Sequence, residues 1–324
     1  MVLPPGYVPY GRRYPVVYWF HGYGGPTYNL TQFAARFRQR MVRGKMPPMI
    51  WVIPDMTTPT GTSEFVDGPN NGPWDTAFTK ELVPYIDRTY RTEARPGARF
   101  LTGHSSGGWA SLHLQLAHPC LFGGAWATSP DPVDFHAFIQ ANLYAPIANV
   151  YRSSDGKTLP LVRQGAHVSS FKAAARTEAV LGTYGGQLTS FEWTFSPRGE
   201  DGRPQPMFDR TTGAVDPAVA AYWQAHYDLA ATLAHITPAD RQSLAGKLHL
   251  WAGGSDSFYL DGAVRRFGAA AKAVEVDATV TIVPDRTHFD LYTENGDPLG
   301  LFDTIAAQMN AALGLVQRGK RDNM

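Results

Sequence analysis

The hydrophobic and polar positions of the chain form two alternating patterns. Short apolar runs rich in β-branched and aromatic residues predict six β-strands, at residues 14–20, 49–54, 99–102, 123–127, 247–251 and 279–283. Longer segments with apolar residues at helical spacing predict helices at residues 30–42, 75–90, 106–118, 261–274 and 301–315. This alternation is typical of an α/β fold with a mostly parallel central sheet and helices on both faces.

The alternation breaks down between residues 129 and 246. Helical spacing returns there at 171–181 and 217–234, separated by a turn-rich stretch without strand periodicity. So long a segment needs structure of its own, and we expect a cap-like insertion folded over the edge of the sheet. The expected organisation is one structural domain, with a core made of residues 1–128 and 247–324 and a cap region at 129–246.

Composition narrows the class of protein. The 324 residues are 44% hydrophobic and 18% charged, and 29 Lys and Arg balance 28 Asp and Glu. This balance argues against a disordered chain and against a nucleic-acid partner. The apolar runs are far shorter than the roughly 20 residues that span a bilayer, so no membrane partner is expected. A single cysteine, Cys120, excludes an intramolecular disulfide and a cysteine-rich zinc site, and the compartment stays unknown.

The pentapeptide G-x-S-x-G at residues 103–107 is the sharpest chemical signal. It lies between the strand expected at 99–102 and the helix expected at 106–118. A nucleophile elbow needs this context, because the glycines allow a tight turn and the helix N-terminus then faces the reacting group. The motif therefore predicts Ser105 as a nucleophile. The alternative is an ordinary glycine-rich turn with an exposed serine.

A nucleophilic serine needs a histidine base and a carboxylate that orients the base. His288 follows the last expected strand, and Asp256 follows the strand expected at 247–251 through a flexible turn. Asp261 and Asp285 are the alternative carboxylates. With Asp256 chosen, the chain order Ser, Asp, His is that of the α/β-hydrolases.

Acyl transfer also needs N–H donors for the oxyanion that develops on the substrate. Ser106 follows the nucleophile and supplies one backbone N–H. Tyr23 lies in the glycine-rich loop at residues 21–25, after the first strand, and is the expected second donor. His288-Phe289-Asp290 offers no third ligand at helical spacing, so neither a metal nor another cofactor is expected.

Together these motifs resemble the putative-esterase family of α/β-hydrolases. This family includes feruloyl and acetylxylan esterases, enterochelin esterases, S-formylglutathione hydrolases and mycolyltransferases. The segments that carry the resemblance are spread over nearly the whole chain: LPPGY at 3–7, RYPVVY at 13–18, HGYGG at 21–25, ELVPYID at 81–87, GHSSGG at 103–108, HP at 118–119, FGG at 122–124, and His288.

The resemblance implies an α/β-hydrolase fold with a cap-like insertion between strands 6 and 7, here the strands expected at 123–127 and 247–251. It also implies a triad of Ser105, Asp256 and His288, with Tyr23 and Ser106 forming the oxyanion hole. The function it implies is a serine carboxylic ester hydrolase acting through an acyl-enzyme. An acyltransferase or thioesterase on the same scaffold is the alternative, and a catalytically silent binding module is an alternative of another class.

Two features depart from the family pattern. Similar proteins usually begin with one or two further strands, and many carry an export signal, so this chain looks short at its front. The apolar strand expected at 49–54 would then form an edge, and such an edge tends to pair with another strand. We therefore expect a homodimer, or another element, to cover it. The second departure is the large cap region, which indicates a shaped or partly covered pocket.

Four aromatic residues are candidates for contact with the substrate: Trp109, Trp193, Trp223 and Phe289. Aromatic rings in these places could stack on a phenolic acyl group or a sugar. The expected substrate is accordingly an ester with an aromatic or carbohydrate moiety, such as a feruloyl or acetyl ester. Packing in the hydrophobic core is the alternative role for each ring.

Overall fold

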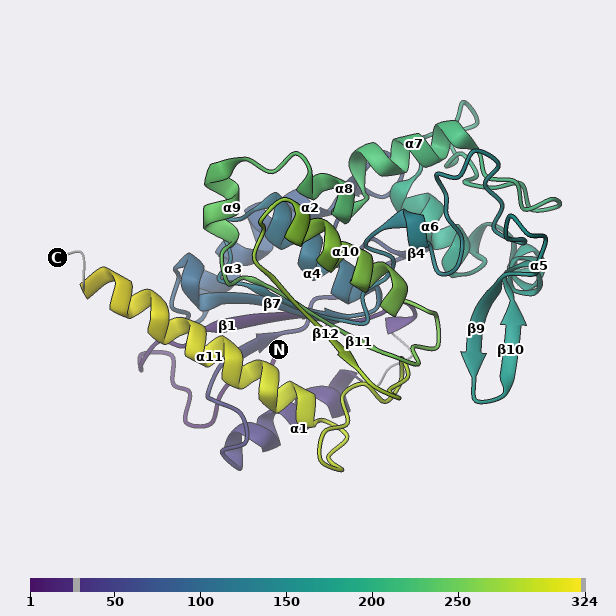
Figure 1. Ribbon diagram of the computed structural model, residues 1–324. Coiled ribbons are helices and arrows are strands. Elements are labelled where there is room, and N and C mark those ends of the chain that lie inside the picture. Colours follow the sequence, from purple (N-terminus) through teal and green to yellow (C-terminus); the bar gives the residue numbers. More distant parts are fainter. Residues whose placement is uncertain (26–29, 322–324) are drawn as a thin grey trace.

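The computed structural model describes residues 1–25 and 30–321 and is built around a six-stranded sheet (Figure 1). All five strand pairings are parallel, in the order β12-β11-β8-β7-β1-β2. The strands are β1 (Val16–Phe20), β2 (Ile50–Val52), β7 (Arg99–His104), β8 (Ala125–Thr128), β11 (Leu248–Gly253) and β12 (Ala278–Val283). They correspond to the six strands expected from the sequence, so the α/β fold with a parallel central sheet is confirmed.

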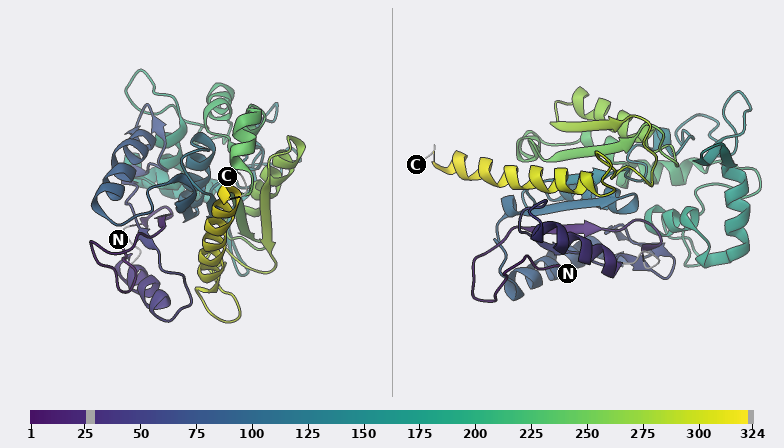
Figure 2. Two further views of the ribbon diagram at one scale, coloured as in Figure 1. Left: turned by 90° about the vertical axis from the view of Figure 1, so that its left-hand side faces the viewer. Right: turned by 90° about the horizontal axis from the view of Figure 1, so that it is seen from below.

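Helices cover both faces of this sheet, and β1 shows why its sequence is apolar throughout. Val16, Tyr18 and Phe20 enter one core and Val17 and Trp19 enter the other, because successive side chains of a strand point to opposite faces. The helices α2 (Trp74–Ala77), α3 (Val83–Thr89), α4 (Ser106–Ala117) and α10 (Asp261–Ala273) pack on the first face. The helices α1 (Leu30–Val42) and α11 (Gly300–Arg321) pack on the second (Figures 1 and 2).

The helix expected at 75–90 forms as one continuous segment with an irregular centre. A π-helical turn, η2 (Phe78–Leu82), separates α2 from α3. This turn lies directly before Pro84, which has no backbone N–H and whose ring would crowd the preceding turn of a regular helix. The π-turn therefore accommodates Pro84, whose effect on the helix could not be predicted from hydrophobic periodicity alone.

The segment between β8 and β11 contains a hairpin and five helices. They are β9 (Pro160–Gln164), β10 (His167–Ser170), α5 (Phe171–Leu181), α6 (Gln187–Phe195), α7 (Pro217–His226), α8 (Leu229–Leu233) and α9 (Pro238–Leu244). The elements from β9 to α7 lie beyond one end of the sheet (Figure 1), whereas α8 packs against α10. The division into a core and a cap at residues 129 and 246 stays a prediction.

The helical spacing at 217–234 corresponds to two helices, α7 and α8. The structure has two helices there, because α7 ends at His226 and the Asp228 side chain caps α8 by accepting the N–H of Ala231 at 2.9 Å. A capping aspartate favours a new helix start over continuation of the old one. The remaining short elements are β3 (Thr57–Thr58), β4 (Gly61–Thr62), β5 (Asp67–Gly68), β6 (Gly72–Pro73), η3 (Pro96–Ala98), η4 (Phe135–Ala137) and η5 (Gly182–Tyr184).

Strand β2 lies at one edge of the sheet, and a residue of the chain itself pairs with it. Val2 donates its N–H to the Trp51 carbonyl at 2.7 Å and accepts the Trp51 N–H at 3.0 Å. The Val2 side chain is buried in the second core. The N-terminal segment of the chain therefore pairs with part of this edge, which is the alternative to a dimer that the sequence analysis named. The homodimer stays a prediction.

Helix α11 is 22 residues long. Neither this helix nor any other within residues 1–25 and 30–321 combines the length and the apolar character needed to cross a membrane.

Candidate active site

Ser105 lies between β7 and α4 in a backbone conformation that is rare for a residue with a side chain. Its φ is 58° and its ψ is −125°. The flanking glycines make this turn possible: a Cβ on Gly103 would lie 2.2 Å from the Gly107 carbonyl oxygen, and one on Gly107 would lie 2.1 Å from that of Phe20. Left-handed backbone outside glycine costs about 1–3 kcal/mol and is characteristic of functional sites. The pentapeptide therefore forms the strand–turn–helix elbow that the sequence indicates.

His288 and Asp256 form a buried pair beside this elbow. His288 Nδ1 lies 3.1 Å from Asp256 Oδ2, and Asp256 is completely buried. The backbone N–H groups of Phe258 and Leu260 donate to Asp256 Oδ1 at 2.9 and 3.3 Å, which leaves Oδ2 for the histidine. Burial by itself would raise the pKa of Asp256, but the hydrogen bond and charge of His288 hold this pKa below its usual value.

The alternative carboxylates lie elsewhere. Asp261 is the first residue of α10 and pairs with Arg265 at 3.5 Å, and Asp285 lies in the turn after β12 with a φ of 60°. Within the described residues, no hydrogen bond joins either carboxylate to His288. Of the three candidates, only Asp256 is brought to the histidine.

Two rings hold the imidazole of His288 in place. The His104 ring centroid lies 4.3 Å from that of His288, and Phe258 contacts the imidazole edge-on at 4.9 Å. Burial, together with the charge of His288, lowers the pKa of His104 to about 3. His104 is therefore neutral at neutral pH and adds no positive charge beside the base.

The hydroxyl of Ser105 donates to a residue that the sequence analysis did not consider. Ser105 Oγ lies 3.0 Å from Asp131 Oδ1, and no hydrogen bond among the described residues joins Ser105 to His288. Asp131 also accepts the Ser106 hydroxyl at 2.6 Å and the Gln187 amide at 3.2 Å, both at Oδ2. Asp131 lies shortly after the carboxyl end of strand β8, where functional residues of parallel sheets gather. This position could have identified it as a candidate site residue.

The glycine-rich loop after β1 lies against the nucleophile. A Cβ on Gly22 would lie 3.2 Å from Ser105 Cβ and 3.8 Å from its Oγ. As the first residue of α4, Ser106 has a backbone N–H without an acceptor inside the helix. Tyr23 follows Gly22 directly. The assignment of the Ser106 and Tyr23 N–H groups as oxyanion donors stays a prediction.

A histidine fixes the shape of this loop. His21 Nε2 lies 3.1 Å from the Met56 backbone nitrogen and 3.2 Å from Asp55 Oδ1, and Nδ1 lies 2.8 Å from the Gly22 carbonyl oxygen. His21 is 1% exposed and therefore acts within the scaffold. The phenol of Tyr23 is half-buried, and burial together with the charge of Glu178 raises its pKa.

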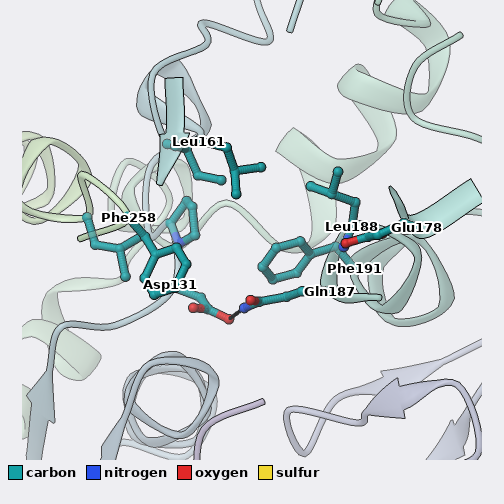
Figure 3. Close-up of a pocket in the computed structure, with 10 residues that line it drawn as sticks. Asp131, Leu161, Glu178, Gln187, Leu188, Phe191 and Phe258 are labelled. Atoms are coloured by element: carbon teal, nitrogen blue, oxygen red, sulfur yellow. Dashed lines mark hydrogen bonds between the residues drawn. The ribbon is translucent and has the colours of Figure 1, made fainter. Parts of the chain in front are cut away.

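Two pockets flank these residues. The first, which we call the cap pocket, carries Asp131, Glu178 and Gln187 as polar groups on otherwise apolar walls (Figure 3). Asp131 and Gln187 are hydrogen-bonded to each other in its wall, and the apolar side chains around them include Leu161, Leu188, Phe191 and Phe258. Ser105 does not line the cap pocket itself, but it is joined to the pocket wall through its hydrogen bond to Asp131.

The second pocket, which we call the α1 pocket, lies on the other side of His288. Gly22, His104 and His288 line it, and apolar rings from β1, α1 and α11 form much of its walls. His288 thus lines the α1 pocket, and Asp131, which accepts the Ser105 hydroxyl, lines the cap pocket.

The four aromatic residues proposed to contact the substrate differ in burial and in whether they line a pocket. Trp109 and Trp223 are fully buried, and Trp223 donates its indole N–H to Ser196 at 3.0 Å, so the expectation that these two contact substrate is wrong. Both pack in the larger core. Trp193 is half-buried on α6 and lines neither pocket. Phe289 is 65% exposed and lines the α1 pocket, and its contact with substrate stays a prediction.

One group in the described part of the chain has the composition of a metal site. Asp134, His136 and Asp228 bring ligand atoms within 4.8 Å of one another. However, Asp134 pairs with Arg266 at 2.9 Å, and Asp228 caps α8 and accepts the Tyr144 hydroxyl at 2.7 Å. Both carboxylates therefore already have hydrogen-bonding or ionic partners, and we assign no metal to the group.

A comparison with protein-family models matches residues 1–245 to the family described as "Putative esterase". The chain belongs to this family. Two curated esterases of Mycobacterium tuberculosis, Esterase MT1326 of strain CDC 1551 / Oshkosh and Esterase Rv1288 of strain ATCC 25618 / H37Rv, are each 36% identical to it over 118 residues. This match covers 35% of the present chain and 24% of each relative, so it spans about a quarter of their length.

Solved structures of similar proteins support the fold of this esterase-family chain. A ferulic acid esterase matches with a TM-score of 0.54 and 14% identity, over 93% of this chain and 86% of the other. An S-formylglutathione hydrolase from Agrobacterium tumefaciens matches with a TM-score of 0.53 and 16% identity, over 96% and 88%. The fold is thus that of the α/β-hydrolases, as expected.

Proposed function

We propose that this esterase-family protein hydrolyses carboxylic esters through an acyl-enzyme on Ser105. The observation that carries the proposal is the position of Ser105 on a strained elbow at the N-terminus of α4, beside the buried pair of His288 and Asp256. Membership of the putative-esterase family supports the same chemistry. A binding module without catalysis would not need a histidine oriented by a buried carboxylate.

The proposed reaction follows from the roles of these groups. Ser105 Oγ attacks the ester carbonyl carbon and its proton passes to His288, while Asp256 holds the Nδ1 proton and stabilises the imidazolium. The backbone N–H groups of Ser106 and Tyr23 donate to the oxyanion of the tetrahedral intermediate. His288 then protonates the leaving alcohol. Water attacks the acyl-enzyme by the same steps in reverse and releases the acid.

The proposed substrate is an ester with an aromatic or carbohydrate moiety. The cap pocket has apolar walls, including Phe191 and Phe258, and a polar end at Asp131 and Gln187. Such a pocket suits a ring that also carries hydrogen-bonding groups. One fold neighbour is named a ferulic acid esterase, which makes feruloyl esters a reasonable first test.

Acyl transfer to an alcohol is the second candidate. It is favoured by the α1 pocket, whose apolar walls adjoin His288 and could hold an acceptor alcohol in place of water. Product analysis in the presence of candidate alcohols separates the two reactions. Acid alone supports hydrolysis, and a new ester supports transfer.

The deciding experiment is labelling with a fluorophosphonate, followed by peptide mapping, together with hydrolysis of short p-nitrophenyl esters. We expect stoichiometric labelling at Ser105, and loss of labelling and turnover in Ser105→Ala. The matched control is Ser154→Ala, because Ser154 is exposed in the segment between β8 and β11. A folded wild-type protein that is neither labelled nor active would contradict the proposed function.

A further inference from the structure

The Ser105 hydroxyl is committed to a carboxylate other than the triad's. A hydroxyl has one proton, so while it donates to Asp131 Oδ1 at 3.0 Å it cannot also donate to His288. Attack on an ester requires the proton to be given to His288. Ser105 must therefore leave Asp131 before it can react.

Asp131 is itself held firmly in this position. Its Oδ2 accepts the Ser106 hydroxyl and the Gln187 amide, and its backbone N–H donates to the Ser105 carbonyl at 3.1 Å. Asp131 is 2% exposed. In contrast to Oδ2, Oδ1 accepts only the Ser105 hydroxyl among the described residues. If Ser105 turns to His288, Oδ1 is left as a buried acceptor without a donor, and this opposes the turn.

A substrate could supply the missing donor. Asp131 lines the cap pocket, so Oδ1 lies next to the space where one part of the ester would bind (Figure 3). The pocket's other charged residue is Glu178, and the lining residues include no Lys or Arg. These acidic surroundings favour a hydrogen-bond donor and oppose an anionic group.

We propose that Asp131 is a positioning residue that holds the Ser105 hydroxyl away from His288 in the free enzyme, and that an ester with a hydroxyl close to its scissile bond displaces the serine. This inference rests on the proposed function and names its substrate class. Oδ1 lies 3.0 Å from the attacking oxygen, so a hydroxyl on the carbon adjacent to the ester-bearing carbon is within reach. The class is therefore esters of vicinal diols and polyols.

The test compares two esters of equal size, 2-hydroxyethyl benzoate and propyl benzoate, which differ by a hydroxyl in place of a methyl group. For the wild type we expect kcat/KM about tenfold higher with the hydroxyethyl ester, in line with one hydrogen bond to a buried acceptor. In Asp131→Ala we expect this preference to disappear. Turnover of the propyl ester should rise several-fold in kcat with little change in KM, because Ser105 is freed, and that of the hydroxyethyl ester should fall.

Opposite changes on the two esters cannot come from general damage to the site. Asp131→Asn preserves the side-chain volume and decides the question if the alanine variant does not fold, with a reduced preference as the supporting result. Asp155→Ala, at an exposed position between β8 and β11, is the control and should leave both rates unchanged.

Three results would overturn the inference. Equal slowing of both esters in the Asp131 variants would make Asp131 a structural residue or a base. A wild type without preference would remove the proposed substrate class. A wild type that cleaves neither ester and is not labelled by a fluorophosphonate would instead refute the proposed function, and the inference with it.

Discussion

His288 Nδ1 lies 3.1 Å from Asp256 Oδ2, although the two residues are 32 positions apart in the chain. The end of β11 and the turn after β12 approach each other closely at this point. A Cβ on Gly253, the last residue of β11, would lie 2.1 Å from the Arg286 carbonyl oxygen. The Ser255 N–H also donates to that oxygen at 2.9 Å. The pair is thus positioned by the register of two adjacent parallel strands.

Replacing the carboxylate should therefore disable the base. In Asp256→Asn we expect kcat to fall by about 10³- to 10⁴-fold, because the amide favours the wrong imidazole tautomer and does not stabilise the imidazolium. The measurement is the hydrolysis of a p-nitrophenyl ester. Asp261→Asn is the matched control, since Asp261 begins α10 and does not bond to His288, and it should retain near-normal kcat. Equal losses in both variants would contradict the assignment of Asp256.

The elbow should not tolerate a side chain at Gly107. A Cβ there would lie 2.1 Å from the Phe20 carbonyl oxygen, so β1 and α4 would have to separate. We expect Gly107→Ala to lower the free energy of unfolding by about 1–3 kcal/mol and to reduce activity strongly. Urea unfolding and ester hydrolysis measure the two effects.

Gly262 in α10 provides the control for this substitution. The nearest atom to a Cβ there would be Ala137 Cβ at 3.8 Å, an ordinary contact. Gly262→Ala should therefore be neutral or stabilise the protein by up to about 1 kcal/mol, with activity retained. If Gly107→Ala behaved in the same way, the close approach at the elbow would be refuted.

Asp75 should make stability depend on pH below neutrality. Its carboxylate lies 2.6 Å from His118 Nε2 and 3.4 Å from His113 Nε2, so it links α2 to α4. Burial opposes ionisation, but the two histidines outweigh it and lower the pKa of Asp75. Its contribution is therefore complete above the unfolded-state pKa of about 3.9 and is lost as the pH falls through the lower folded-state pKa.

Urea unfolding between pH 5 and 2.5 tests this dependence. We expect Asp75→Asn to be less stable than the wild type at pH 5, with the difference shrinking as the pH falls. Asp201→Asn, in an exposed turn, should match the wild type throughout. A difference that stays constant with pH would show that Asp75 acts through packing alone.

The proposed mechanism uses no metal. We therefore expect ester hydrolysis to be unchanged after incubation with EDTA and after dialysis. The same preparation assayed with and without added Zn²⁺ provides the control. Loss of turnover in EDTA that zinc restores would show that the chemistry depends on a metal ion.

The sequence by itself determined the architecture and the elbow that carries Ser105. The six strands were readable because both faces of a parallel sheet are covered, which makes strands such as β1 apolar at every position. The elbow was readable because its strained turn requires glycines at fixed offsets from Ser105. Both signals are local, since each depends on residues close together in the chain.

Tertiary structure decided the rest. The bond from Ser105 to Asp131, and the burial of Trp109 and Trp223, depend on how the segment between β8 and β11 packs over the strand ends. The pairing of Val2 with Trp51 likewise joins distant positions. No local pattern encodes such contacts, because a carboxylate or an aromatic ring has the same sequence signature whether it faces a pocket, a core or a neighbouring strand. Only the folded arrangement of distant segments gives each side chain its partner.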